Sequence, residues 1–150
     1  MKKCVAAVLA CLMLTGCGFC AGVVDEDKVV AEANKVLKAL YMDRDFKGAY
    51  DMCGDLLKRM VMSEDLEKNV LAMESYAGKV KLFKPVSYAP TQQGITVFYT
   101  AINERGVSYH KVNLAGNAMQ GYKVVGVYVN DHPEFIEYKK STVVLGSESI

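Results

Sequence analysis

The chain has 150 residues, enough for one domain and a short targeting segment, and 51% of them are hydrophobic. No stretch is low in complexity, so a packed core is expected and wholesale disorder is excluded. The formal net charge is +1, and it becomes −1 without residues 1–16, which carry Lys2 and Lys3. A near-neutral surface without a basic stripe has no electrostatic reason to bind nucleic acid, so no nucleic-acid partner is expected.

Residues 1–16 have the pattern of an export signal. Lys2 and Lys3 precede an apolar run over residues 4–14, CVAAVLACLML. These eleven residues are too few to span a membrane, because a hydrocarbon core of about 30 Å takes roughly 20 residues in a helix. We therefore predict a signal peptide and not a transmembrane helix.

The signal ends in Leu14-Thr15-Gly16-Cys17. This motif resembles the lipobox of bacterial lipoproteins, in which a branched apolar residue, a small residue and Gly or Ala precede Cys. The resemblance implies cleavage before Cys17 and acylation of that cysteine, which would anchor the chain stably in a membrane. Residues 17–24 would then form a lipidated tether. The alternatives are an ordinary signal peptide cut near Cys20-Ala21 or a buried N-terminal helix.

The residue after the lipidated cysteine bears on the location. In Gram-negative bacteria an Asp at this position retains lipoproteins in the inner membrane, and this chain has Gly18 there. The resemblance to those sorting rules therefore implies a cell-envelope protein, held on the outer membrane and facing the periplasm if the host is Gram-negative.

The chain has five cysteines, of which Cys4 and Cys11 would leave with the signal peptide and Cys17 would carry lipid. An exported location permits a disulfide between the remaining two, Cys20 and Cys53. Because Cys20 lies in the tether and Cys53 on the apolar stripe of a predicted helix, a free, buried Cys53 is the favoured alternative. The mature region has no Cys/His cluster with metal-ligand spacing, so no metal or cofactor is predicted.

Helical periodicity dominates the first half of the mature chain. Apolar residues from Val29 to Leu40 recur at helical spacing and predict a helix over about 25–42, which begins at acidic residues that favour a helix N-terminus. Asp43-Arg44-Asp45 breaks this helix. The period continues from Phe46 to Met60 and predicts a second helix, in which Gly54 costs about 1 kcal/mol relative to Ala.

A third helix is predicted to begin with Ser63 as its N-cap and to end at Gly78, a natural C-cap. Its apolar stripe, Leu66, Val70 and Met73, extending to Tyr76, is expected to be buried.

After Gly78 the period changes from helix to strand. Residues 79–88 alternate, but Pro85, Pro90 and the stretch Gln92-Gln93-Gly94 are expected to interrupt this strand. Strands are predicted over 95–102, 107–114 and 122–129, joined by turns at 103–106 and 116–121. The tail, 132–150, is predicted either to add an edge strand around 141–145 or to remain loose.

Helices followed by strands favour an α+β fold in which the N-terminal helices pack on one face of a curved antiparallel sheet. We divide the chain into a signal peptide (1–16), a lipidated tether (17–24), a single α+β domain (25–131) and a C-terminal tail (132–150).

The domain also resembles a family of small secreted bacterial domains, domain of unknown function 4019. The residues that carry this resemblance are Leu40, Phe46, Ala49-Tyr50-Asp51, Leu57-Lys58, Met62-Ser63-Glu64-Asp65, Tyr76-Ala77-Gly78 and Gly121-Tyr122-Lys123-Val124-Val125-Gly126. The resemblance implies a cystatin-like, nuclear-transport-factor-2-like cone of helices wrapped by a sheet, without an agreed activity.

A cone of this kind encloses a pocket between sheet and helices. The candidate pocket residues are aromatic or histidine: Tyr76, Phe98, Tyr99, Tyr109, His110 and Tyr128. Strand alternation places Phe98 and Tyr99 on opposite faces but does not choose between them, nor between Tyr109 and His110. A half-exposed surface position is favoured for His110, and a solvated helix face for Asp51.

Two functions remain open, and the first is favoured. The first is a membrane-anchored, non-enzymatic envelope protein that binds or assembles, as a homodimer or with a protein partner, through the exposed face of the sheet. Its motive is apolar content on both sheet faces, more than one core face needs: Phe98, Ile102, Val112, Val125 and Val127. The second is a pocket that binds, or acts on, a small hydrophobic or aromatic ligand. No motif of a nucleophile elbow, P-loop, zinc protease or dinucleotide-binding loop is present, so a non-enzymatic role is favoured.

Overall fold

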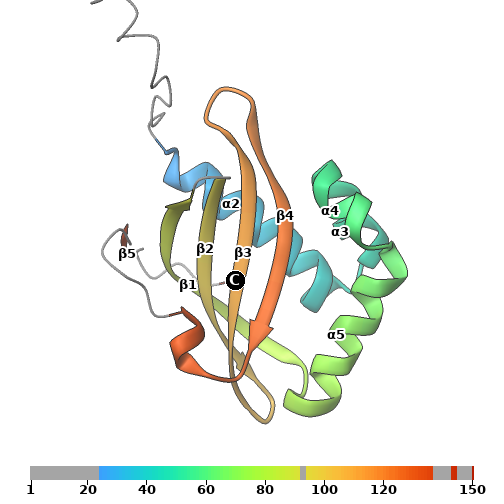
Figure 1. The fold of residues 1–150 in the computed structure, drawn as a ribbon. Coiled ribbons are helices and arrows are strands. Elements are labelled where there is room, and N and C mark those ends of the chain that lie inside the picture. The colour runs from blue at the N-terminus through green and yellow to red at the C-terminus, as the bar shows by residue number, and fades with distance from the viewer. Residues whose placement is uncertain (1–23, 92–93, 137–142, 145–149) are drawn as a thin grey trace, which may run out of the picture.

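The computed structural model describes residues 24–91, 94–136, 143–144 and 150. The helices lead and the strands follow, so the predicted α+β class and curved antiparallel sheet are confirmed (Figure 1). The elements are α2 (Glu26–Lys38), η1 (Ala39–Asp43), α3 (Phe46–Met52), α4 (Asp55–Met60), α5 (Ser63–Ala77), β1 (Val80–Thr91), β2 (Gly94–Asn103), β3 (Gly106–Asn117), β4 (Gly121–Asn130), η2 (Pro133–Ile136) and β5 (Val143–Val144). In this part of the chain, no helix has both the length and the apolar character needed to cross a membrane.

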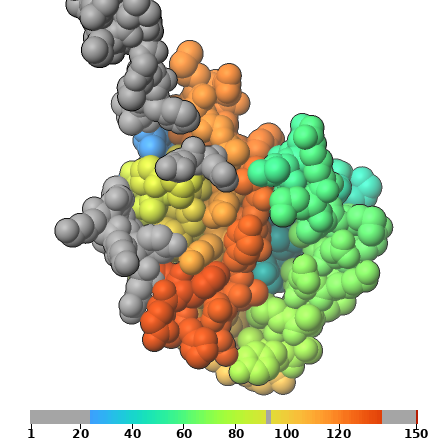
Figure 2. Space-filling view, in the orientation of Figure 1, coloured from blue at the N-terminus to red at the C-terminus, as the bar shows by residue number. Residues whose placement is uncertain are grey.

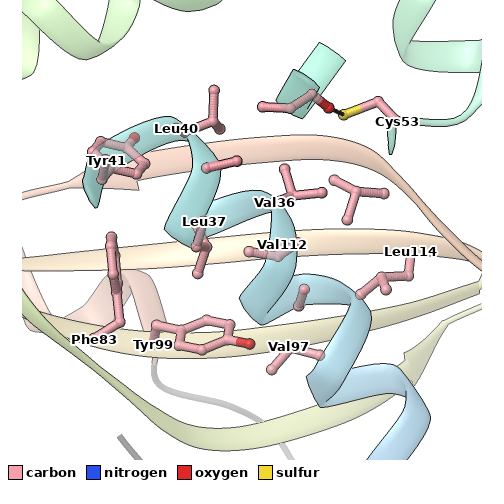
Figure 3. Packing of buried hydrophobic residues seen from close by; sticks show 14 of the residues in the cluster. Val36, Leu37, Leu40, Tyr41, Cys53, Phe83, Val97, Tyr99, Val112 and Leu114 are labelled. Atoms are coloured by element: carbon pink, nitrogen blue, oxygen red, sulfur yellow. Dashed lines mark hydrogen bonds between the residues drawn. The ribbon is translucent and has the colours of Figure 1, made fainter. Parts of the chain in front are cut away.

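α2 forms the centre of the helical layer. Its N-cap is Asp25, whose carboxylate accepts a hydrogen bond from the Lys28 N–H at 3.2 Å. The apolar stripe that predicted this helix faces the sheet, and we call the face that it covers the inner face (Figure 3). Val36 and Leu37 of α2 point toward Val97, Tyr99 and other side chains of the strands, forming one continuous core.

The last turn of the predicted first helix is wider than an α-helix. Residues Ala39–Asp43 form the π-helix η1, and Arg44 then ends it in the left-handed region with a φ of 58°. Leu40 and Tyr41, two consecutive residues of this turn, are both buried. A π turn is a single-turn widening that is found often at functional sites.

The predicted second helix, 46–60, is wrong as one continuous element. The chain leaves α3 at Cys53, passes through Gly54 in extended conformation and begins α4 at Asp55. The N–H of Gly54 donates to the carbonyl of Val124 on β4 at 2.8 Å. A helix through Gly54 could not make this tertiary hydrogen bond, so the bond offsets the helical hydrogen bonds that are lost there.

The third helix agrees with its predicted range, but its cap is shifted by one residue. Met62 is the N-cap and Ser63 the first helical residue. The Asp65 carboxylate accepts a hydrogen bond from the Met62 N–H at 3.0 Å, so the acidic residue makes the capping contact. At the other end Gly78 is the C-cap, with a φ of 80° that favours glycine.

The sheet has the strand order β4-β3-β2-β1-β5, with every pair antiparallel. The predicted interruption at Pro85 and Pro90 is wrong, because β1 runs through both prolines, with a register shift between Pro85 and Ser87; Gln92 and Gln93 lie outside the described residues. On its outer edge, β1 pairs with β5 at Ser87 and Tyr88, and its Phe83 exchanges main-chain hydrogen bonds with Ile150. The prolines lack an N–H but lie away from these pairs, which is where a strand tolerates proline.

β4 is the opposite edge of the sheet. The α3–α4 connection covers part of that edge, through the hydrogen bond from Gly54 to Val124. Farther along the strand, β4 runs beside α5, and the two are separated by a gap in the ribbon view (Figure 1). The free edge of the sheet therefore borders the last helix.

Candidate ligand-binding cleft

A cleft of about 700 Å³ lies between α5 and the second half of β4. The space-filling view shows it as a hollow between the orange strand and the green helix (Figure 2). Its floor is Leu40 and Tyr41 from η1. Because the π turn brings both of these consecutive side chains inward, the end of the first helix closes the bottom of the cleft.

The walls of the cleft are mostly apolar. α5 contributes the stripe of Leu66, Val70 and Met73, of which only Val70 is fully buried. β4 contributes Val127 and Val129, which face the inner side because they pair with the inward residues of β3. The remaining lining residues are Asn69, Ala72, Tyr76, Ala77, Val107, Ser108, Tyr128, Asn130, Asp131 and Phe135.

The described lining of the cleft contains almost no charged side chains. Among the described residues that line the cleft there is no Lys, Arg or His, and Asp131 is the one charged side chain. A carboxylate or phosphate in the cleft would therefore have no cationic partner. Because an unpaired charge is costly to move out of water, the lining favours an uncharged occupant.

One wall of the cleft contains a buried polar network. Ser108 lines the cleft and is only 4% exposed. Its Oγ accepts a hydrogen bond from the Asn103 Nδ2 at 2.9 Å and forms a second with the Nε2 of His110, also at 2.9 Å. Within the described part of the chain, Asn103 Oδ1 and His110 Nδ1 have no hydrogen-bond partner.

The prediction that His110 is half-exposed is wrong. The imidazole is fully buried, and the rings of Tyr41 and Phe83 pack against it edge-to-face, with centroids 5.4 and 5.0 Å away. Burial lowers the pKa of His110 to about 3, so the ring is neutral at physiological pH. In this setting His110 holds Ser108 in position and is not itself in contact with the cleft.

The structure separates the predicted pocket residues into two groups. Tyr76 and Tyr128 line the cleft at its rim, where both side chains are largely exposed. Tyr99 points into the core, and its hydroxyl donates to the Asn34 Oδ1 at 2.8 Å. Phe98 is fully buried on the opposite, outer face, and Tyr109 lies on that same face. Neither Phe98, Tyr99, Tyr109 nor His110 lines the cleft.

The apolar strand residues that suggested pairing through the sheet are divided between its two faces. Val112 and Val127 pair with each other across β3 and β4 and face the core, not the outside. η2 covers part of the outer face, with the Lys111 ammonium 4.0 Å from the centroid of the Phe135 ring. Ile102 remains exposed. Pairing of two copies through this face stays a prediction.

Of the three cysteines predicted to remain in the mature chain, Cys53 is the one that the structure describes. Cys53 is buried, and its thiol donates to the Ala49 carbonyl at 3.2 Å (Figure 3). Burial raises the pKa of the Cys53 thiol to about 11, as expected for a small hydrophobic side chain in a core. Cys17 and Cys20 lie outside the described residues.

Sequence reasoning missed the floor of the cleft and Ser108. The signal for Ser108 was present, because residues 108, 110, 112 and 114 alternate inward once Val112 and Leu114 are recognised as core. The floor had no such signal, since nothing in the composition of 39–43 distinguishes a π turn from the end of an α-helix. The α5 stripe of Leu66, Val70 and Met73 forms a wall of the cleft because no strand packs directly over it in the described structure.

Comparisons with known proteins provide no family assignment. No family model, no curated protein and no solved structure matches the chain.

Proposed function

We propose that this chain is a lipid-anchored binding protein of the bacterial envelope, which holds an uncharged, largely apolar small molecule in the cleft between α5 and β4. The observation that carries the proposal is the cleft itself, a volume of about 700 Å³ lined by apolar side chains and without a cationic residue among its described lining. Sites for small ligands are typically concave, mostly apolar and about 300–1,000 Å³ in volume.

The anchoring half of the proposal rests on the sequence. An apolar run too short to span a bilayer ends at Cys17 in a motif that resembles a lipobox. Val24 is the first described residue, and six residues of the sequence, 18–23, separate it from that cysteine. A tether this short would hold the domain close to the membrane surface, where apolar molecules concentrate.

A binding role agrees better with the lining than catalysis does. The described part of the cleft lining includes no histidine, and the one carboxylate in it, that of Asp131, belongs to an exposed residue. General acid–base catalysis requires a titratable group within hydrogen-bond reach of the reacting atoms. In the described residues there is also no cluster of three or more His, Cys, Asp or Glu that could hold a metal ion.

Photo-cross-linking of the full chain in its own cells tests the proposal. Cells that produce the chain would be treated with a photoactivatable alkyl diazirine, and the adducts on the isolated protein would be located by mass spectrometry. We expect adducts on residues of α5 and β4 that line the cleft. A matched pair of variants on α5 provides the control: Met73→Trp fills the cleft, whereas Leu71→Trp adds the same ring on the solvent side, where Leu71 is 44% exposed.

The expected result is loss of the cleft adducts in M73W and their retention in L71W. Adducts that are equally abundant in both variants would contradict binding in the cleft. So would labelling of the unaltered chain that is confined to peptides outside α5 and β4.

A further inference from the structure

The hydroxyl of Ser108 has one hydrogen-bonding position that none of the described residues fills. A serine hydroxyl can donate one hydrogen bond and accept two. Asn103 Nδ2 donates to the Oγ at 2.9 Å, and the His110 Nε2 takes a second position at 2.9 Å. Ser108 lines the cleft. The third position is therefore available to a molecule in the cleft.

The network behind Ser108 holds the hydroxyl in a fixed place. Asn103, Ser108 and His110 are each at most 4% exposed, and the His110 ring is enclosed by Tyr41 and Phe83. Asn103 Oδ1 and His110 Nδ1 remain without partners. A core that leaves two buried polar atoms unsatisfied is costly, so this arrangement is explained more readily by a role than by packing alone.

The role of the free position depends on the His110 tautomer. With the proton on Nε2, the ring donates to Ser108, whose own hydrogen is then free to donate into the cleft. With the proton on Nδ1, the Ser108 hydroxyl donates to the ring and keeps a free acceptor position. An alcohol is a suitable partner in both cases, because a hydroxyl group both donates and accepts.

We propose that Ser108 is the polar anchor of the cleft and that it selects apolar ligands that carry a single uncharged hydroxyl group. This inference rests on the proposed function, because it names the ligand class of the same cleft. A carboxylate head group is disfavoured for two reasons. The described lining has no cation, and it contains Asp131. An ammonium head group that pairs with the carboxylate of Asp131 would leave the third hydrogen-bonding position of Ser108 unfilled.

The test uses the full chain in lipid nanodiscs, with methionine labelled at its methyl carbon. Met73 lines the cleft and reports binding, whereas Met119, which is 98% exposed on the β3–β4 turn, reports non-specific effects. The probes are toluene, 1-octanol, octanoate and octylammonium. We expect 1-octanol to shift the Met73 signal at lower concentration than octanoate or octylammonium, with Met119 unchanged.

Ser108→Ala should weaken 1-octanol binding by about two- to twelvefold, since a net hydrogen bond contributes about 0.5–1.5 kcal/mol. Toluene has no hydrogen-bonding group, so its affinity should change by less than about twofold, which also shows that the variant is folded. Ser108→Thr keeps the hydroxyl and should restore the preference for 1-octanol. Ser75→Ala removes a hydroxyl from an exposed position of α5 that does not line the cleft, so it is the matched control and should leave 1-octanol binding unchanged.

The outcomes separate this inference from the proposed function. If toluene and 1-octanol bind but S108A weakens neither, Ser108 is not the anchor, and the cleft remains a binding site. Tighter binding of octanoate than of 1-octanol would overturn the selection of uncharged ligands. Absence of any Met73 shift with all four probes would overturn the proposed function and this inference together.

Discussion

Arg44 donates hydrogen bonds from one guanidinium nitrogen to both carboxylate oxygens of Glu74, each at 2.8 Å. The two residues are 30 positions apart in the chain, and they connect the end of the first helix to the last turns of α5. Because η1 forms the floor of the cleft and α5 forms one wall, this ion pair joins two of the surfaces that define the cleft. The Glu74 side chain is only 9% exposed, whereas that of Arg44 is 35% exposed.

Loss of Arg44 should be more harmful than neutralisation of Glu74. Arg44→Met leaves a carboxylate that is largely shielded from water without its partner, which is the costly way to break such a pair. We expect the urea midpoint to fall in the order wild type, Glu74→Gln, Arg44→Met. The double variant should recover part of the loss relative to Arg44→Met, because it removes the unpaired charge. Equal midpoints for Arg44→Met and the double variant would contradict this explanation.

Acid should destabilise the fold partly through His110. Its pKa is lowered from 6.5 to about 3 in the folded state, so below pH 6.5 the unfolded chain binds more protons. The contribution to stability is complete above pH 6.5 and is lost as the pH falls toward 3, by at most about 1.4 kcal/mol per unit. His110→Gln lacks this term.

The measurement is the free energy of unfolding of wild type and His110→Gln, obtained from urea titrations between pH 7.5 and 4.5. The free energy of unfolding of wild type minus that of His110→Gln should decrease as the pH falls, because only the wild type loses the contribution of His110. The carboxylates affect both proteins alike and cancel in this difference. Curves that remain parallel over this range would show that His110 is not buried in its neutral form.

The hydroxyl of Tyr99 should stabilise the contact between α2 and the sheet. Tyr99 donates to Asn34 at 2.8 Å in a setting that is largely closed to water. Tyr99→Phe should lower the free energy of unfolding by about 1 kcal/mol, as expected for one net hydrogen bond. Tyr76→Phe removes the same atom from a side chain that is 74% exposed and should change stability by less than about 0.5 kcal/mol. Similar values for the two variants would argue against the Tyr99–Asn34 bond.

Two glycines at strand ends should respond differently to alanine. A Cβ at Gly94, where φ is 152°, would clash with the carbonyl oxygen of Leu114. At Gly106, where φ is 151°, the same atom would meet nothing within 4 Å. Gly106→Ala should therefore show the backbone strain alone, about 1–3 kcal/mol. Gly94→Ala should be more destabilising in urea titrations, and a smaller loss for Gly94→Ala would contradict the close approach of β2 and β3.

Membrane attachment should depend on Cys17. Intact-mass measurement of the protein purified from its own cells should find a mature N-terminus at Cys17 that carries acyl chains, and the protein should fractionate with membranes. Cys17→Ser should abolish the acyl mass and release the chain from the membrane fraction, because no other anchor is predicted. Cys20→Ser, three residues farther on, is the matched control and should leave both properties unchanged. An acylated protein in C17S would contradict the lipobox.

Elements that depend on local periodicity agree with the sequence-based predictions, whereas elements that depend on contacts with distant segments do not. The first helix, the range of the third helix and the strands after residue 94 agree with their periodic patterns. The break at Gly54 does not follow from periodicity, because it depends on a hydrogen bond to Val124, 70 positions away. β1 likewise continues through Pro85 and Pro90, which lie opposite Tyr99 and Ile95 of β2, and this pairing is a property of the whole sheet.

The sequence by itself determined the α+β class, the order of the elements and the apolar stripes, because these depend on the spacing of side chains along a local helix or strand. Only the tertiary structure decided that Ser108 and His110 share one buried network, that the π turn of Leu40 and Tyr41 forms a floor, and that the α5 stripe faces a cleft. The floor and the cleft depend on the distance between segments remote in the chain, and the Ser108–His110 network is buried because Tyr41 and Phe83 pack against it from other elements. Local periodicity contains no information on that distance, because it is set by how the elements pack.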